Sequence, residues 1–408
     1  MKNLFKSIGV PVLISVFLFI YAAAPLCAQE DTTIYGYFST RYEKVFNEPS
    51  ISGAKTVKSD SPGEIGFPFV NIMIRSQIDE NINTFVNINA ADAEGLDIRN
   101  IWGEHTFSEQ LTLRVGKMYR RFGLYNEILD AVPTYIGIEP PELFDQDHLI
   151  ISRTTNIMLY GALQTGVNTF NYSISTDDGE GGRDRDTFPL GVDFNYRFNN
   201  DSSVVGLSGY SSGGATGSDV DLGDGSPRSG VLPWMQEDEF VVYGAYFETN
   251  PGDLVLQGAY WRADHDAIRD PASVVTVIND AGVNAAQMKR FLINPAGGVT
   301  NSNVRQDGDY NVDTYYFRAG YSIGEFMPYL QLDWYENPET IADKGYGGDS
   351  EAGVADDGKF RKDTIGVVYR PSPKVAIKLD GSQHVFKFNG KTESYPEVRL
   401  DFSYIFGL

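Results

Sequence analysis

The chain has 408 residues and a formal net charge of -22. Its 42% hydrophobic content and mean hydropathy of -0.26 are too polar for a membrane protein built from helices. They suit either a soluble domain or a β-barrel with a wet lumen. The acidic excess argues against a nucleic-acid partner and against docking on an anionic membrane surface.

The N-terminus predicts an export signal. Lys2 and Lys6 precede an apolar run over Ile8–Ala24, and small residues lead to a cleavage site that we place after Ala28. The alternative, an uncleaved signal anchor, is disfavoured by the shortness of the run. We therefore expect a signal peptide over residues 1–28 and a single domain over residues 29–408. Cleavage there would remove Cys27, the one cysteine, and with it any thiolate metal site or disulfide.

The remainder of the chain resolves into alternating apolar and polar residues in runs of roughly ten, the length of a tilted transmembrane strand. In the second run, for example, Val70, Ile72 and Ile74 alternate with Asn71 and Arg75. The pattern predicts sixteen strands: Thr33–Phe46, Phe67–Asp79, Ile82–Ala93, Asn100–Phe107, Gln110–Arg120, Asn156–Gln164, Gly166–Ser175, Phe188–Phe198, Ser203–Ser211, Glu239–Glu248, Leu254–Ala263, Asn311–Ser322, Phe326–Glu336, Arg361–Arg370, Lys374–Phe388 and Tyr395–Leu408.

The connections between these runs alternate in length. Short turns such as Glu80-Asn81 and Gly324-Glu325 alternate with longer segments such as Asp264–Tyr310, which has weak helical periodicity. Short turns at one end and long loops at the other are typical of outer-membrane barrels, and an even strand number returns both termini to the short-turn end. The fold class we predict is all-β: a 16-stranded antiparallel transmembrane β-barrel with short periplasmic turns and long extracellular loops.

The third connection on the long-loop side, Arg121–Thr155, differs from a solvated loop because it is rich in apolar residues. It needs something to pack against, and the barrel interior is the available place. We therefore expect this third loop to fold into the lumen. Its apolar residues are Ile128, Leu129, Val132, Tyr135, Ile136, Ile138, Leu143 and Phe144.

The segment that leads into this loop carries a family resemblance. It reads Leu-Arg-Val-Gly-Lys-Met-Tyr-Arg-Arg-Phe-Gly over Leu113–Gly123, a basic strand end that runs into a long loop. With the strand order and the alternating terminal strand, this segment resembles the general bacterial porins and, more closely, the phosphate-selective porin-like group. The resemblance implies a homotrimer in which the third loop constricts each lumen. One departure is that the chain ends on Leu408, where many of these proteins end on Phe.

Strand alternation, loop position and a local cluster of basic residues select the charged residues that could line a constriction. Wall arginines that face loop carboxylates would set up a field that sorts ions, whereas the simpler interpretation is that these charges line a wet lumen or hold the loop. The candidate lining residues are Arg41, Arg75, Arg114, Lys117, Arg120, Arg121, Glu127, Asp130, Glu139, Glu142, Asp145, Arg153 and Arg197; Arg318, Lys378 and Arg399 share the lumen side further round.

The ion preference is left open by these residues. The acidic total favours cations, whereas the basic cluster of Lys117, Arg120, Arg121 and Arg153 favours anions such as phosphate or carboxylates. Neutralising Arg114 and Arg120 is expected to shift selectivity toward cations.

The function that the sequence favours is a porin in the outer membrane of a Gram-negative-type bacterium, a passive diffusion channel for small hydrophilic solutes or ions. Its expected partners are outer-membrane lipid, lipopolysaccharide and two further copies of the chain. We expect no catalysis, cofactor or metal. The acidic loop around Asp177–Glu180 could hold Ca²⁺, but the spacing misses the EF-hand register.

Two alternatives remain. One is a barrel plugged by its loops that binds a partner or acts as a scaffold, favoured by the length of Asp264–Tyr310. The other is an outer-membrane hydrolase, which would need a Ser–His or Asp–His arrangement on a strand or at the rim. Gly209–Gly213 matches G-x-S-x-G, but it does not lie at a strand-to-helix elbow, so the match is treated as chance.

Overall fold

A computed structural model describes residues 31–52, 55–66, 69–91, 95–129, 131–134, 136–141, 153–177, 188–214, 232, 234–281, 283–341 and 353–407. The predicted signal over residues 1–28 lies outside these ranges, as do the candidate residues Asp130, Glu142 and Asp145. Most of the acidic loop that follows Asp177 lies outside them too.

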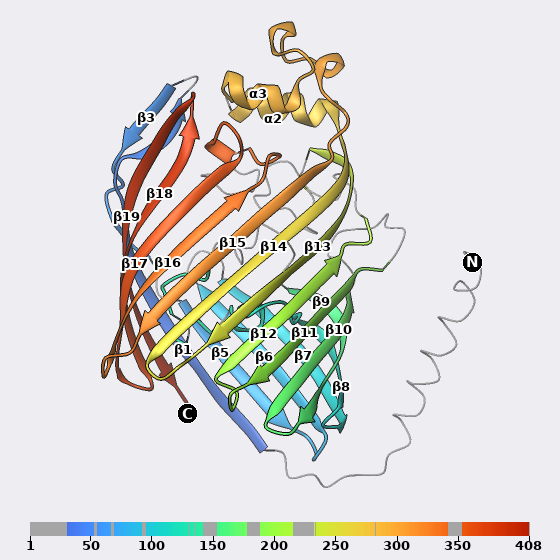
Figure 1. The fold of residues 1–408 in the computed structure, drawn as a ribbon, viewed down its shortest axis with the longest axis vertical. Helices are drawn as coiled ribbons and strands as arrows, with labels where there is room; N and C mark the ends of the chain where they lie inside the picture. Colours follow the sequence, from blue (N-terminus) through green and yellow to red (C-terminus); the bar gives the residue numbers. More distant parts are fainter. Residues whose placement is uncertain are drawn as a thin grey trace, which may run out of the picture.

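The described residues form one closed antiparallel barrel of sixteen long strands (Figure 1). Each strand pairs with the next one along the chain, and β19 pairs with β1 through Arg41–Asp401 and Gly36–Phe406 to close the wall. A two-residue strand, β4 (Glu64–Ile65), adds to β1 at one end. The long strands are β1 (Asp31–Val45), β5 (Phe69–Gln77), β6 (Ile82–Ala91), β7 (Gly95–Ser108), β8 (Leu111–Tyr119), β9 (Arg153–Thr165), β10 (Asn168–Asp177), β11 (Leu190–Phe198), β12 (Ser203–Ser211), β13 (Met235–Thr249), β14 (Leu254–Arg269), β15 (Tyr310–Tyr321), β16 (Phe326–Glu336), β17 (Lys359–Ser372), β18 (Val375–Phe388) and β19 (Lys391–Phe406).

The predicted strands correspond one to one with these sixteen, so the sequence-based fold class is confirmed. The short turns lie at one end of the barrel, where β1 begins and β19 ends (Figure 1). The two largest boundary errors are at β14, which continues to Arg269 rather than ending at Ala263, and at β7, which begins at Gly95 rather than Asn100. At β7 the expected turn is part of the strand: Leu96 and Ile98 are exposed on the outer face, and Ile101 is exposed as well after a bulge in the register opposite Asn87 and Ile88.

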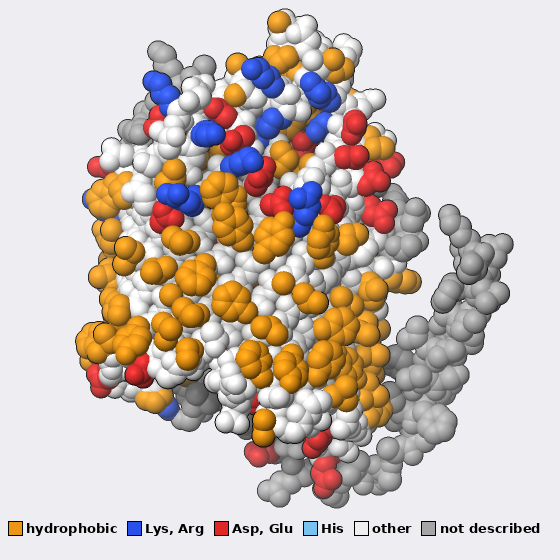
Figure 2. Space-filling model, viewed as in Figure 1, with side chains coloured by type: hydrophobic (Ala, Val, Ile, Leu, Met, Phe, Trp, Pro, Cys, Tyr) orange, Lys and Arg blue, Asp and Glu red, His pale blue; other side chains and the backbone are white. Residues whose placement is uncertain are grey.

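The outer face of the wall is apolar. Val205, Leu207, Leu330, Leu332 and Phe402 are among the large hydrophobic side chains that the strands expose. Figure 2 shows these residue types as a belt across the middle of the barrel, with charged side chains gathered toward the end that carries the helices. An outward apolar belt with polar ends is the surface that a bilayer requires of a spanning barrel.

The inner face is where side chains bury. Trp234, Phe240 and Trp261 from the wall pack with Phe122 and Tyr125 of the third loop in one cluster. Ser39 and Asp401 are buried on the same inner face and hydrogen-bond to each other across the β1–β19 seam. The core of this fold therefore lies inside the barrel.

Two loops at the long-loop end contain secondary structure of their own. The first long loop in chain order folds into a small hairpin of β2 (Glu48–Ser52) and β3 (Lys55–Ser59). The sixth holds the helices α2 (Pro271–Ala281) and α3 (Ala285–Phe291), in agreement with its weak helical periodicity. Asn284 caps α3 through a capping box with Gln287. None of the helices in the described ranges is long and apolar enough to cross a membrane.

Candidate functional site: the third loop inside the lumen

The third loop leaves β8 and turns into the barrel, as its apolar content predicts. Phe122 and Ile138 are almost fully buried, and the Phe122 ring lies 5.4 Å from that of Trp261 on β14. Near the root of the loop, the Gly123 amide donates to Ser208 Oγ of β12 at 2.9 Å. A single turn of 3-10 helix, η1 (Asn126–Ile128), follows.

Further along, the loop is held mainly through its backbone carbonyls. Lys378 Nζ donates to the carbonyls of Val132 and Gly137 at 2.6 and 2.7 Å. Arg370 Nη2 donates to the carbonyls of Pro133 and Thr134 at 3.2 and 3.3 Å. These cations come from β18 and β17, across the barrel from the root of the loop. The loop therefore spans the lumen from one wall to the other.

Glu139 is the side chain on which the far wall converges. Arg41 Nη1 approaches its carboxylate at 2.8 Å and Lys362 Nζ at 3.2 Å, and Arg399 forms a third ion pair with it. The Glu139 side chain is 30% exposed and that of Arg41 28%, so water reaches this cluster. One loop carboxylate thus faces three wall cations, of which Arg41 is in contact with solvent and Lys362 and Arg399 are buried.

A second charged cluster lies on the wall from which the loop departs. Arg114 pairs with Glu104 at 2.9 Å and stacks over the Trp102 ring at 4.1 Å. Glu127 of the loop reaches back toward Arg114 at 3.6 Å and toward Arg121 at 3.3 Å. This cluster is also partly exposed, with Glu127 at 40%.

The other candidates divide into three groups. Arg120 faces inward but is completely buried, paired with Asp177 at 2.6 Å, so solutes in the lumen do not reach it. Arg75 and Arg197 face inward near the short-turn end and are exposed. Lys117 and Arg153 do not belong with the lining residues, because strand alternation and register place them on the outward face.

The register explains that correction. On β8 the inward positions are Arg114 and Met118, so Lys117 between them shares the outward side with the exposed Val115, and it pairs with outward-facing Ile101. Arg153 pairs with Tyr119 on that same outward register and lies over its ring. Both residues were predicted to line the lumen because they lie in a basic stretch of the sequence. The alternation of side chains along the strand places them on the outer face instead.

Several contributors were missed by sequence reasoning. Lys362 and Arg370 were absent from the candidates although Lys362 alternates inward on β17 with Phe360 and Thr364. Tyr125 is the third. Its hydroxyl donates to Gln257 at 2.6 Å and is contacted by Arg318, so it ties the loop to β14 and β15. Pleat alternation could have found Lys362, whereas nothing in the sequence pattern singles out Tyr125.

The wall cations lower the pKa of the Glu139 carboxyl. Burial alone would raise its pKa, but Arg399, Lys362 and Arg41 outweigh burial and hold the pKa well below the ordinary 4.5. A depressed carboxyl pKa contributes stability that is present above the unfolded-state value and is lost as pH falls through the folded-state value. Loop docking is therefore expected to persist unchanged from pH 7 to pH 5 and to weaken only below about pH 4. Current noise in single-channel recordings across that pH series checks this, and a change between pH 7 and pH 5 would contradict it.

The docked conformation of the loop requires a glycine at position 137, because its φ of +88° lies in the left-handed region. A Cβ there would lie 3.1 Å from both Arg318 Nη2 and the Glu139 carbonyl oxygen. Gly137→Ala should cost about 1–2 kcal/mol of unfolding free energy and increase the current noise of the loop. Gly324→Ala is the matched control: its φ is +59° but no atom lies within 4 Å of the new Cβ, so strain appears without loosening the loop. Thermal unfolding and channel noise of both variants separate the two effects.

Comparison with known proteins shows which solved structures share this fold. No protein-family model and no curated protein sequence matches the chain. Among solved structures, an anion-selective porin from Comamonas acidovorans matches with a TM-score of 0.57 and 13% identity, over 93% of this chain and 100% of that one. The outer-membrane channel DcaP of Acinetobacter baumannii matches at 0.56 and 11%, over 94% and 100%. The trimer form of OmpT, an outer-membrane protein of Vibrio cholerae, matches at 0.53 and 8%, over 92% and 99%. The likeness is one of fold.

Proposed function

We propose that this chain is an outer-membrane porin, a passive diffusion channel for small hydrophilic solutes or ions. The observation that carries the proposal is the cluster of Glu139, Arg41, Lys362 and Arg399 inside a closed barrel with an apolar outer belt, a cluster that water reaches at Glu139 and Arg41. A loop pinned across a lumen by partly exposed ion pairs narrows an aqueous path and lines it with fixed charge. The fold shared with an anion-selective porin and with the channel DcaP supports the same function.

The proposed assembly is a homotrimer in the outer membrane, in contact with lipid and lipopolysaccharide. The trimer form of OmpT supports this assembly through its shared fold. Chemical cross-linking of the detergent-solubilised protein is expected to give a three-copy species, and a species limited to one copy would remove this part of the proposal.

Catalysis is not part of the proposal, although the structure does contain an Asp–His pair. His265 Nδ1 lies 2.9 Å from Asp238, near the long-loop end of β13 and β14. The imidazole is only 4% exposed and is stacked between Phe240 at 4.8 Å and Tyr310 at 4.0 Å. A ring enclosed in this way stabilises packing and does not meet a substrate. Hydrolysis of lipid or peptide by the purified barrel would overturn this view.

A liposome-swelling assay tests the proposed function directly. Liposomes that contain the protein are expected to swell in a small sugar and to stay unchanged in a large dextran, with protein-free liposomes as the control. If both kinds of liposome respond alike to the small sugar, the lumen is plugged and the binding or scaffold alternative is favoured.

A further inference from the structure

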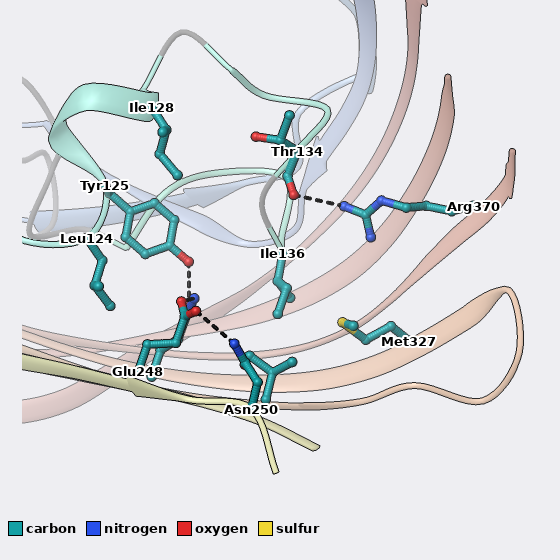
Figure 3. A pocket seen from close by; sticks show the side chains of 11 residues that line it. Leu124, Tyr125, Ile128, Thr134, Ile136, Glu248, Asn250, Met327 and Arg370 are labelled. Carbon is teal, nitrogen blue, oxygen red and sulfur yellow. Dashed lines mark hydrogen bonds between the residues drawn. The ribbon is translucent and has the colours of Figure 1, made fainter. Parts of the chain in front are cut away.

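A pocket of about 300 Å³ lies between the third loop and the wall, near the short-turn end of the barrel. The loop contributes apolar and hydroxyl-bearing side chains, and β13, β14, β16, β17 and the turn after β13 contribute the rest (Figure 3). Its volume is at the lower end of the range for small-molecule sites. The pocket is separate from the Glu139 cluster, since none of the four residues of that cluster lines it.

The pocket has opposite charges on two sides. Glu248 of β13 lies on one side and Arg370 of β17 on the other, with Ile136 and Met327 between them (Figure 3). Val255 and Leu124 add to the apolar lining. An acid, an apolar middle and a guanidinium in that order form a site for a molecule with an ammonium at one end and a carboxylate at the other.

Both charged ends are held in place by other groups. Glu248 accepts hydrogen bonds from Asn250 at 3.0 Å and from Gln257 at 2.6 Å, and Gln257 is itself fixed by the Tyr125 hydroxyl. Arg370 is oriented by its bonds to the loop carbonyls of Pro133 and Thr134. Preorganised charges bind a ligand with less loss of side-chain entropy than mobile ones.

The separation of the two ends limits the ligand class. Between β13 and β17 lie β14, β15 and β16, so the two backbones are about 19 Å apart along the wall at ~4.8 Å per strand. The two side chains reach inward and cover part of that span. A free α-amino acid carries both charges on one carbon and has the shortest reach of such molecules, whereas each added residue lengthens a peptide by about 3.3–3.6 Å.

We propose that this pocket binds apolar peptides of two or three residues with free termini, the ammonium against Glu248 and the carboxylate against Arg370. The inference deepens the proposed function, on which it rests, by naming a class of solute that pauses in the lumen. It requires the third loop in its docked position, because five of the lining residues belong to that loop: Leu124, Tyr125, Ile128, Thr134 and Ile136.

Calorimetric titration of the folded full-length protein in detergent tests the proposal without relying on conduction. The probes are Leu-Leu, N-acetyl-Leu-Leu and Leu-Leu amide. We expect Leu-Leu to bind, and each blocked form to bind on the order of tenfold more weakly, since each loses one charge-assisted contact. Failure of Leu-Leu to bind, or equal binding of all three peptides, would overturn the proposal.

Variants assign each terminus to its partner. Glu248→Gln should remove the difference in affinity between Leu-Leu and its N-acetyl form. Arg370→Gln should remove the difference in affinity between Leu-Leu and its amide. Arg370→Lys keeps the charge and should keep the difference. Glu239→Gln and Arg361→Gln lie on the outward side of the same two strands and should change nothing. Equal weakening of all three peptides in both pocket variants would show a purely structural role and sink the proposal.

The two proposals fail in distinguishable ways. A protein that conducts ions but does not bind Leu-Leu keeps the channel function and loses the peptide site. A protein that binds the peptides with the expected charge pattern but does not conduct keeps the site and loses the passive channel.

Discussion

Glu139→Gln is expected to shift ion selectivity strongly toward anions. The substitution removes the carboxylate that Arg41, Lys362 and Arg399 share, and the partly exposed Arg41 then faces the lumen without it. Arg399 keeps its pairs with Glu397 and Glu43, so the net change at the cluster is the loss of one negative charge. The anion-to-cation permeability ratio should rise several-fold, and docking of the loop should weaken by about 2–3 kcal/mol, below the cost for a fully buried pair because Glu139 is partly exposed. Reversal potentials in asymmetric salt measure the first effect and current noise the second.

Two controls accompany this substitution. Glu139→Asp keeps the charge and should retain most of the wild-type selectivity. Glu336→Gln removes a carboxylate that is paired with Lys359 on the outward face, so it should leave the reversal potential unchanged. A wild-type reversal potential in Glu139→Gln would show that this cluster is not at the narrowest point.

Arg120→Met is expected to give the largest loss of stability, about 3–5 kcal/mol, with little direct effect on selectivity. Arg120 and Asp177 are both fully buried at 2.6 Å, and the guanidinium also lies over the Tyr210 ring at 4.1 Å. Removing the cation leaves the buried Asp177 carboxylate without the charge that neutralises it. Thermal unfolding in detergent, followed by circular dichroism, gives the measurement.

The double variant Arg120→Met with Asp177→Leu should recover much of that loss, because it removes both buried charges. If the double variant is as unstable as the single one, packing rather than the ion pair accounts for the effect. Arg114→Gln provides the comparison for selectivity, since Arg114 is 14% exposed beside Glu127 and should shift the channel toward cations. Sequence reasoning assigned that shift to both arginines, and burial now separates them.

The barrel was predictable because strand alternation is a local signal that each strand repeats. One face of every strand meets lipid, so the pattern of Val70, Ile72 and Ile74 persists around the wall. Alternation also located Arg114 and Arg399 on the inner side. If alternation had been applied to every charged residue, it would have excluded Lys117 from the lumen lining and included Lys362.

The contacts of the third loop were less predictable for a physical reason. The sequence suggested pairs of wall arginines and loop carboxylates, and Glu139 fits that pattern. Lys378 and Arg370, however, bind backbone carbonyls of the loop, Lys378 those of Val132 and Gly137. Every residue has a carbonyl, so side-chain identity carries no trace of such bonds. The pocket between Glu248 and Arg370 was hidden for a related reason, since it exists only once the loop is docked.

The docked loop narrows the aqueous path through the lumen but does not close it. Planar-bilayer recording of the wild-type protein is the decisive measurement of this open path. We expect discrete conductance steps, grouped in threes for a trimer, with a non-zero reversal potential in asymmetric salt. A folded, inserted protein that gives no conductance would contradict it.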